Sequence, residues 1–325
     1  MDNTTYRYAG LQQISSPGLS VAQASERLRR FAYVERRLMR LLASRVVSIP
    51  QRDIKALLAR IQYEAALHAN AWRNRVVEMR TNKSRLEGSP DTALEILFDE
   101  AEHLPDTYPF LFVVISLLKP ALSDAYRAYE ATTNELADYE SVRIVRQHLA
   151  DEEQHLQLLN LAVTDLEPNE EERSTAAEWR KRLAAYLDAG GGVDGSSPRA
   201  AARLREASLQ PYHVPRTLAR DTSIPRVWDF TTPATDDAKS YLDYLLAIRI
   251  SEINVSEGLA IVLCETPDRP WSFYLDIARH CWDEMRHSLF GEAGIEALYD
   301  RRDALPMRDY EGVYVTEALP LEQYA

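Results

Sequence analysis

The chain has 325 residues, 46% hydrophobic and 27% charged, so it is long enough to bury one large core or two smaller ones. Its net charge of −12 argues against a nucleic-acid partner, which requires a basic surface, and only 11 glycines favour helices over a turn-rich β fold. The N-terminus lacks the apolar core of a signal peptide, the apolar run 110–118 is too short to span a bilayer, and two cysteines without an expected bridge suit a reducing compartment. We therefore expect a cytoplasmic protein with no membrane partner.

Two long amphipathic helices are predicted in the N-terminal region 1–108. Residues 21–48 have helical apolar spacing and end before Pro50, and residues 52–80 repeat the pattern. In the second helix, Glu64 and His68 interrupt an apolar stripe. They are either a polar pair satisfied within the core or groups that reach a metal site. We expect these helices to pack on the rest of the protein.

A first helical hairpin is predicted over 109–165, with arms 109–137 and 139–165. Pro120 lies inside its first arm, where it removes a helical hydrogen bond and should kink or restart the helix. The second arm places Glu152 at the centre of an apolar stripe. A buried ionised Glu costs several kcal/mol without a partner, so Glu152 requires a cation or a proton.

A long crossover, 166–235, separates this hairpin from a second one at 236–297. The crossover contains a predicted helix near 170–188, a short basic helix near 199–206, and a glycine tract at 190–195 that we expect to be mobile above a site entrance. The second hairpin has arms 236–265 and 271–297. Glu252 is at the centre of its first apolar stripe, and Glu257 is a competing acid.

The sequence pattern H-x-x-D-E-x-x-H occurs twice, at 148–155 and at 280–287. Residues three apart share a helix face, so each copy presents one Glu and one His side by side. A carboxylate and an imidazole so arranged form half of a transition-metal site.

The two copies also share an upstream pattern. Each is preceded by a Leu-Leu pair and then by Ser and an acid, which is Asp124 in the first case and Glu252 in the second. The acids lie 28 residues (152 − 124) and 32 residues (284 − 252) before the glutamates of the motif. A helical hairpin with a short turn brings residues at such separations level with each other.

These features resemble the ferritin-like di-iron carboxylate proteins, in which two hairpins each supply a lone acid and an E-x-x-H pair. The resemblance covers roughly 110–165 and 238–297. It implies an all-α fold, a ferritin-like four-helix bundle over 109–300 made of two hairpins and the long crossover, with extra N-terminal helices and a tail at 301–325. The implied metal ligands are Asp124, Glu152, His155, Glu252, Glu284 and His287.

The resemblance also implies supporting residues around the metal. Asp151 would orient His287, and Asp283 would orient His155, by hydrogen bonds to their second ring nitrogens. His148 and His280 are extra relative to the pattern and are either core histidines or supporting residues around the metal, or else additional ligands. Glu64 is a substitute should Asp124 be misplaced, and His68 is a further neighbour of the site.

The resulting functional expectation is a non-haem oxidase or oxygenase with two iron ions, or one iron and one manganese, that uses dioxygen on a small organic substrate. An external electron donor is compatible with this chemistry, and so is a homodimer. The alternatives are a ferroxidase-like or peroxide-consuming metal protein, hydrolytic metal chemistry, and a metal-free helical interaction protein.

Overall fold

The structure is a computed structural model that describes residues 7–105, 107–200, 211–234 and 236–309. These residues are mainly helical, which confirms the predicted all-α class. They form two compact units: unit 1 comprises the described residues up to 37 and from 68 to 200, and unit 2 comprises those from 38 to 67 and from 211 to 309. The predicted basic helix near 199–206 and most of the tail 301–325 lie outside the described residues.

The two predicted N-terminal helices are present as α1 (Val21–Ser48) and α2 (Arg52–Glu78). Each contributes residues to both units, since the boundaries of the units fall at Arg37 in α1 and at His68 in α2. The two predicted hairpins, in contrast, belong to different units.

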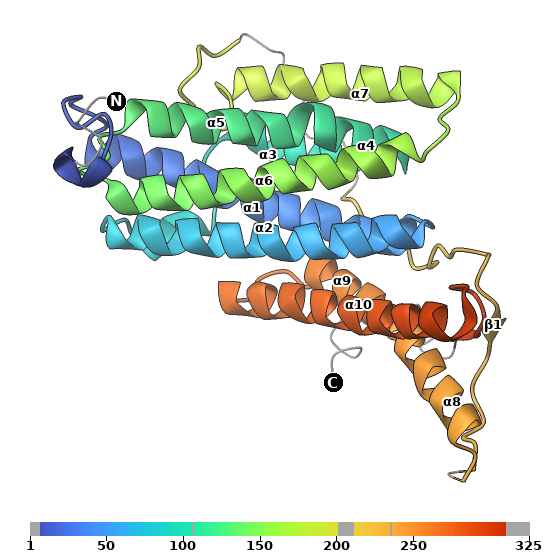
Figure 1. Cartoon of the computed structure of the whole chain (residues 1–325). Coiled ribbons are helices and arrows are strands. Elements are labelled where there is room, and N and C mark those ends of the chain that lie inside the picture. The colour runs from blue at the N-terminus through green and yellow to red at the C-terminus, as the bar shows by residue number, and fades with distance from the viewer. Residues whose placement is uncertain (1–6, 106, 201–210, 235, 310–325) are drawn as a thin grey trace, which may run out of the picture. The chain divides into compact units, whose positions relative to one another are not determined.

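Unit 1 is completed by one short helix before α1 and by helices that follow α2 in the chain. They are η1 (Arg7–Gly10), η2 (Lys83–Leu86), α3 (Thr92–Ala101), α4 (Tyr108–Val113), the π-helix η3 (Val114–Leu118), α5 (Lys119–Thr132), α6 (Tyr139–Thr164) and α7 (Glu170–Ala189). Helices α5 and α6 lie within the two arms predicted for the first hairpin and pack against each other (Figure 1). α7 packs against α3 and α4, as the crossover helix.

The predicted distortion at Pro120 takes the form of a π-turn. Helices α4, η3 and α5 are continuous, and η3 ends immediately before Lys119 and Pro120. Because Pro120 has no N–H, the Ser116 carbonyl lacks a helical donor there, and Arg180 of α7 donates to it at 3.3 Å. A π-turn adds one residue and so rotates the helix that follows by about 100°. This rotation decides which residues of α5 face the interior.

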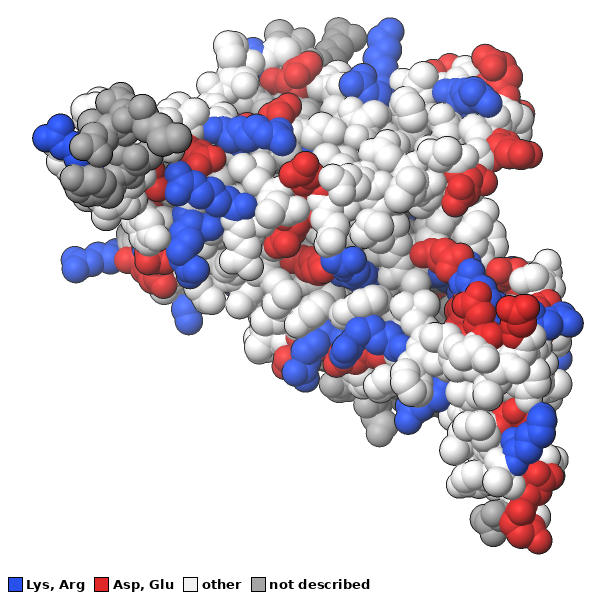
Figure 2. Space-filling model, in the orientation of Figure 1, with Lys and Arg blue, Asp and Glu red and all other residues white. Residues whose placement is uncertain are grey.

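The stretch Tyr108–Thr132 is apolar and long enough to cross a membrane by length and composition alone. Its most apolar window is 61% buried inside the protein, as expected for a core helix, so it is weak evidence for a membrane span. On the face shown in Figure 2, acidic and basic side chains are interspersed over the described residues.

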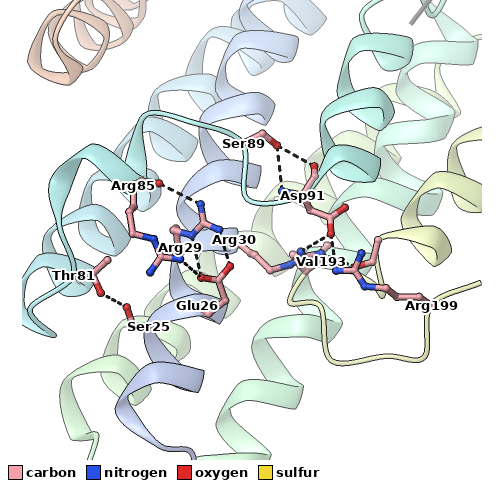
Figure 3. A network of polar contacts seen from close by, with 11 residues as sticks. Ser25, Glu26, Arg29, Arg30, Thr81, Arg85, Ser89, Asp91, Val193 and Arg199 are labelled. Carbon is pink, nitrogen blue, oxygen red and sulfur yellow. Dashed lines mark hydrogen bonds and ion pairs between the residues drawn. The ribbon is translucent and has the colours of Figure 1, made fainter. Parts of the chain in front are cut away.

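The glycine tract is held by hydrogen bonds, so the expectation of a mobile segment above a site entrance is wrong. Figure 3 shows Arg30 between Val193, at the end of this tract, and Asp91. The buried Arg30 of α1 donates to the carbonyls of Gly190, Gly192 and Val193 at 2.8–2.9 Å. Arg30 also pairs at 3.2 Å with Asp91, which caps the N-terminus of α3. Burial lowers the pKa of Arg30 although Asp91 opposes the shift. The loop therefore ties the end of α7 to α1 and α3.

Unit 2 contains, besides its parts of α1 and α2, the elements that follow residue 210. Its elements are β1 (Arg226–Val227), α8 (Ala238–Ser251), α9 (Ile253–Glu265), α10 (Trp271–Tyr299) and β2 (Met307–Arg308). β1 and β2 pair in parallel, with Arg226 opposite Met307. The second hairpin differs from its prediction, because its first arm is broken at Glu252 into α8 and α9, and both pieces pack against α10 (Figure 1).

Candidate metal centres

The break between α8 and α9 places one predicted acid beside two predicted ligands of α10. Glu252 is the C-terminal cap of α8 and the N-terminal cap of α9. Glu284 and His287 lie one turn apart on α10. One ligand atom from each of these three residues lies within 4.8 Å of the other two. The structure thus brings together the three predicted ligands of the second half of the chain.

Small residues allow α8 and α9 to approach α10 this closely. A Cβ atom at Gly291 would lie 2.6 Å from Cβ of Arg249 and 2.8 Å from the Ile250 nitrogen, so only glycine fits there. The Ser288 hydroxyl donates to the Ile250 carbonyl at 3.0 Å and fixes the end of α8 on α10. On the other side of the break, the Ser256 hydroxyl donates to the Cys281 carbonyl at 2.8 Å and fixes α9.

The distances within the trio suit a transition-metal ion. His287 Nδ1 lies 3.3 Å from an oxygen of Glu284 and 3.5 Å from an oxygen of Glu252. Ligands at about 2.1 Å from a metal are separated by about 3.0–3.4 Å in octahedral or tetrahedral geometry. The Glu252 and Glu284 side chains are 20% and 16% exposed and that of His287 is 47% exposed, so an ion can reach them from solvent.

Two neighbours hold the acids in place. Arg249 donates to both oxygens of Glu252 at 2.8 and 3.1 Å. The His280 Nε2 atom lies 3.0 Å from the second oxygen of Glu284, one turn earlier on α10. His280 is therefore a positioning residue for Glu284, one of the two roles expected for it. Asp283 pairs with Arg286 on its own helix, which contradicts its predicted role as the partner of His155.

The competing acids are already paired. Glu257 is fully buried and forms ion pairs with Lys55 of α2 and with Arg220. Glu64 pairs with Arg60 at 3.0 Å. Neither acid is therefore needed as a substitute ligand. The nearby Cys281 thiol is free, and burial raises its pKa to about 12, so it is not a thiolate ligand at neutral pH.

The other E-x-x-H pair lies in the interior of unit 1, where a lysine binds it. Glu152 and His155 of α6 are fully buried, and so is Lys119 of α5. The Lys119 ammonium donates to Glu152 Oε1 at 2.6 Å and to His155 Nδ1 at 3.2 Å. Although burial alone would raise the pKa of Glu152, the charge of Lys119 holds it below its usual range. This half of the predicted site therefore contains a cation supplied by the chain.

Asp124 does not join this pair, so its assignment as a ligand is wrong. Its side chain is 77% exposed and pairs with Arg127 on the same helix at 3.0 Å. The prediction that Asp151 orients His287 is also wrong, because its carboxylate lies 3.1 Å from Nε2 of His68 on α2.

A second buried cluster surrounds His68. Its Nδ1 atom lies 3.0 Å from Oε1 of Glu35, a fully buried acid of α1 that also accepts a 2.6 Å hydrogen bond from Tyr126. Burial would lower the pKa of His68, but the charge of Glu35 and hydrogen bonds to Asp151 and Glu35 raise it to about 9. Both ring nitrogens face carboxylate oxygens, so His68 is an imidazolium at neutral pH.

His148 of α6 packs against this cluster but is itself uncharged. Its ring stacks on His68 with 3.8 Å between centroids and 22° between planes. Burial and the neighbouring charges of His68 and Lys119 lower the pKa of His148 well below its usual value, so it is neutral. Ligand atoms of Glu35, His68 and His148 lie within 4.8 Å of one another. However, nearly parallel stacked rings cannot both direct in-plane lone pairs at one ion.

Glu35 and Lys119 were not predicted as site residues, although a signal for Glu35 exists. Glu35 interrupts the apolar stripe of α1 formed by Leu28, Phe31, Leu38 and Leu42, as Glu64 and His68 do in α2. Lys119 gave no comparable signal, because the π-turn before it changes the helical register.

The chain matches no protein-family model, no curated protein and no solved structure.

Proposed function

We propose that the protein binds a divalent first-row transition-metal ion, iron or manganese, through Glu252, Glu284 and His287. The observation that carries this proposal is the approach of His287 Nδ1 to one oxygen of each acid, at 3.3 and 3.5 Å. Two carboxylates and one imidazole suit these metals better than a thiol-preferring ion. Three protein ligands leave coordination positions for water or a substrate.

We further propose that the bound ion serves a non-haem oxidoreductase that acts with dioxygen on a small organic substrate. Iron or manganese in such a set supplies redox chemistry toward oxygen. The residues of the chain would bind and orient the ion, with Glu252 held by Arg249, and with Glu284 held by His280. This second step is supported by the resemblance in sequence and by the ligand types, and it is less specific than the first.

The metal proposal is tested by the stoichiometry of bound Mn²⁺ on the apo protein, by equilibrium dialysis and by loss of the free-ion resonance signal. We expect one tightly bound ion per chain, lost in Glu284→Gln and in His287→Gln. Asp276→Asn removes an exposed acid of the same helix and is the matched control. Unchanged binding in both ligand variants would refute the site.

The main competing function is a metal-free interaction protein, in which His287 is an imidazolium paired with both acids. It predicts no bound Mn²⁺ and a fall in stability on His287→Gln substitution. Oxygen consumption after anaerobic Fe²⁺ loading distinguishes an oxidase or oxygenase from a ferroxidase. Uptake that depends on added organic compounds supports an oxidase or oxygenase. Uptake that is stoichiometric with Fe²⁺ alone supports a ferroxidase.

A further inference from the structure

A ferritin-like bundle would carry a metal pair at its centre, and the centre of unit 1 does not fit that expectation. Four helices each contribute to this centre: Glu35 from α1, His68 from α2, Lys119 from α5, and Glu152 with His155 from α6. All five side chains are at least nine-tenths buried. We propose that Lys119 and His68 are internal cations that take the place of metal ions in unit 1, so that this centre binds no metal whereas the site of unit 2 does; the second half of this statement rests on the proposed function.

The hydrogen bonds of Lys119 carry the first step. An ammonium group only donates, so His155 Nδ1 is the acceptor in its contact with Lys119, and the same atom lies 3.3 Å from Glu152 Oε1. Lys119 thereby takes the lone pairs of Glu152 and His155 that a metal bound by this E-x-x-H pair would use. A metal at the pair would also lie beside a buried like charge, which opposes its binding.

His68 does the same for the other acid. Its two ring nitrogens lie 3.0 and 3.1 Å from oxygens of Glu35 and Asp151, which leaves neither nitrogen for a metal. The two buried acids Glu35 and Glu152 are thus matched by two side-chain cations. The charges of the two buried acids are therefore balanced without any ion, and only the partly exposed Asp151 adds a further negative charge. A divalent ion would add two positive charges to a buried region whose acids are already paired.

The backbone supports this assignment of Lys119. The π-turn at Val114–Leu118 ends directly before it and sets the register of α5. Buried positions then recur at Lys119, Ser123 and Tyr126, which are spaced by one turn each. Lys119 therefore occupies the interior stripe of α5, on which the fourth helix of such a bundle would present an acid.

Two buried oxygens and one buried nitrogen at the centre of unit 1 have no hydrogen-bond partner in the described part of the chain and are available as ligand atoms. Among the described residues, no group forms a hydrogen bond with Glu35 Oε2, Glu152 Oε2 or His148 Nδ1. Removal of the Lys119 side chain would add the Oε1 lone pairs of Glu152 and the Nδ1 lone pair of His155 to this set. The centre should then bind a divalent ion.

The test measures Mn²⁺ bound per full-length chain in four variants. The double variant Glu284→Gln/His287→Gln changes only partly exposed residues and should fold; we expect it to retain no Mn²⁺. Adding Lys119→Ala to it should restore one ion per chain, and adding His155→Gln as well should remove that ion again. Lys119→Arg, which keeps the charge, is the matched control and should bind none.

Several results would overturn the proposal. Tightly bound Mn²⁺ in the double variant, or a folded Lys119→Ala chain with no added ion, contradicts it. If Lys119→Ala fails to fold, the double variant alone still decides, because its metal content reports on the intact centre of unit 1. Failure of the proposed metal site in unit 2 can be told apart from failure of this inference. In that case the wild-type chain would bind no Mn²⁺, whereas the Lys119→Ala substitution would still add one ion.

Discussion

The two Glu and His clusters of this protein differ in the source of their positive charge. In unit 1 the acids are fully buried and are neutralised by Lys119 and His68. In unit 2 the acids Glu252 and Glu284 are partly exposed. Glu252 pairs with Arg249, which is itself half-exposed, and one oxygen of each acid lies near the half-exposed imidazole of His287. The same H-x-x-D-E-x-x-H pattern therefore leads to a closed, self-neutralised centre in one case and to an accessible ligand set in the other. The partner residues, and not the motif, decide between the two.

The largest effect is expected from Lys119→Met, which leaves Glu152 buried and unpaired. Loss of one partner from a buried ion pair costs about 3–5 kcal/mol. Urea denaturation at pH 7 without metal should show this loss in the free energy of unfolding. The double variant Lys119→Met/Glu152→Gln should recover a large part of it, because no charge is left unpaired. A loss below about 1 kcal/mol in the single variant would show that Glu152 is already neutral.

A comparable effect is expected from pH, through His68. Its pKa is raised to about 9 in the folded protein against about 6.5 when unfolded. The stabilisation is thus fully present below pH 6.5 and is lost as pH rises through 9. A shift of this size corresponds to at most about 3 kcal/mol. Denaturation at pH 6, 7.5 and 9.5 measures it, and His68→Gln should flatten that part of the profile. An equally steep profile in His68→Gln would assign the dependence to another group.

These two predictions concern residues that sequence reasoning recovered only in part. The long helices followed from apolar periodicity and prolines, and the duplicated motif correctly placed Glu284 beside His287. The identity of the helices that meet in unit 1 did not follow, because packing of α1 and α2 against α5 and α6 depends on contacts distant in sequence. Glu35 and Lys119 were not predicted as site residues, because only this packing brings them next to His68 and Glu152.

A smaller effect is expected at the close approach of α8 to α10. Gly291→Ala would place Cβ 2.6 Å from Cβ of Arg249 and 2.8 Å from a backbone nitrogen, so the end of α8 must move. We expect a cost of about 1–3 kcal/mol, together with weaker Mn²⁺ binding, since Glu252 moves with α8. In Gly294→Ala the new Cβ meets mainly the end of the flexible Leu246 side chain. That variant is the control and should bind Mn²⁺ normally. Equal Mn²⁺ affinity in the two variants would show that the distance between α8 and α10 does not control the geometry of the metal site.

The smallest effect is expected at Asp124, the ligand that the sequence suggested and the structure does not support. Lys119, Ser123 and Tyr126 occupy the buried stripe of α5, so Asp124 faces outward, and its pair with Arg127 is exposed at both ends. Exposed pairs of this kind contribute about 0–1 kcal/mol. Asp124→Asn should therefore leave the free energy of unfolding nearly unchanged and should not alter the Mn²⁺ stoichiometry. Glu284→Gln makes the same change from acid to amide and should abolish binding. If Asp124→Asn abolished it instead, the metal would belong to the centre that the duplicated motif first suggested, and the assignment of the metal to unit 2 would fail.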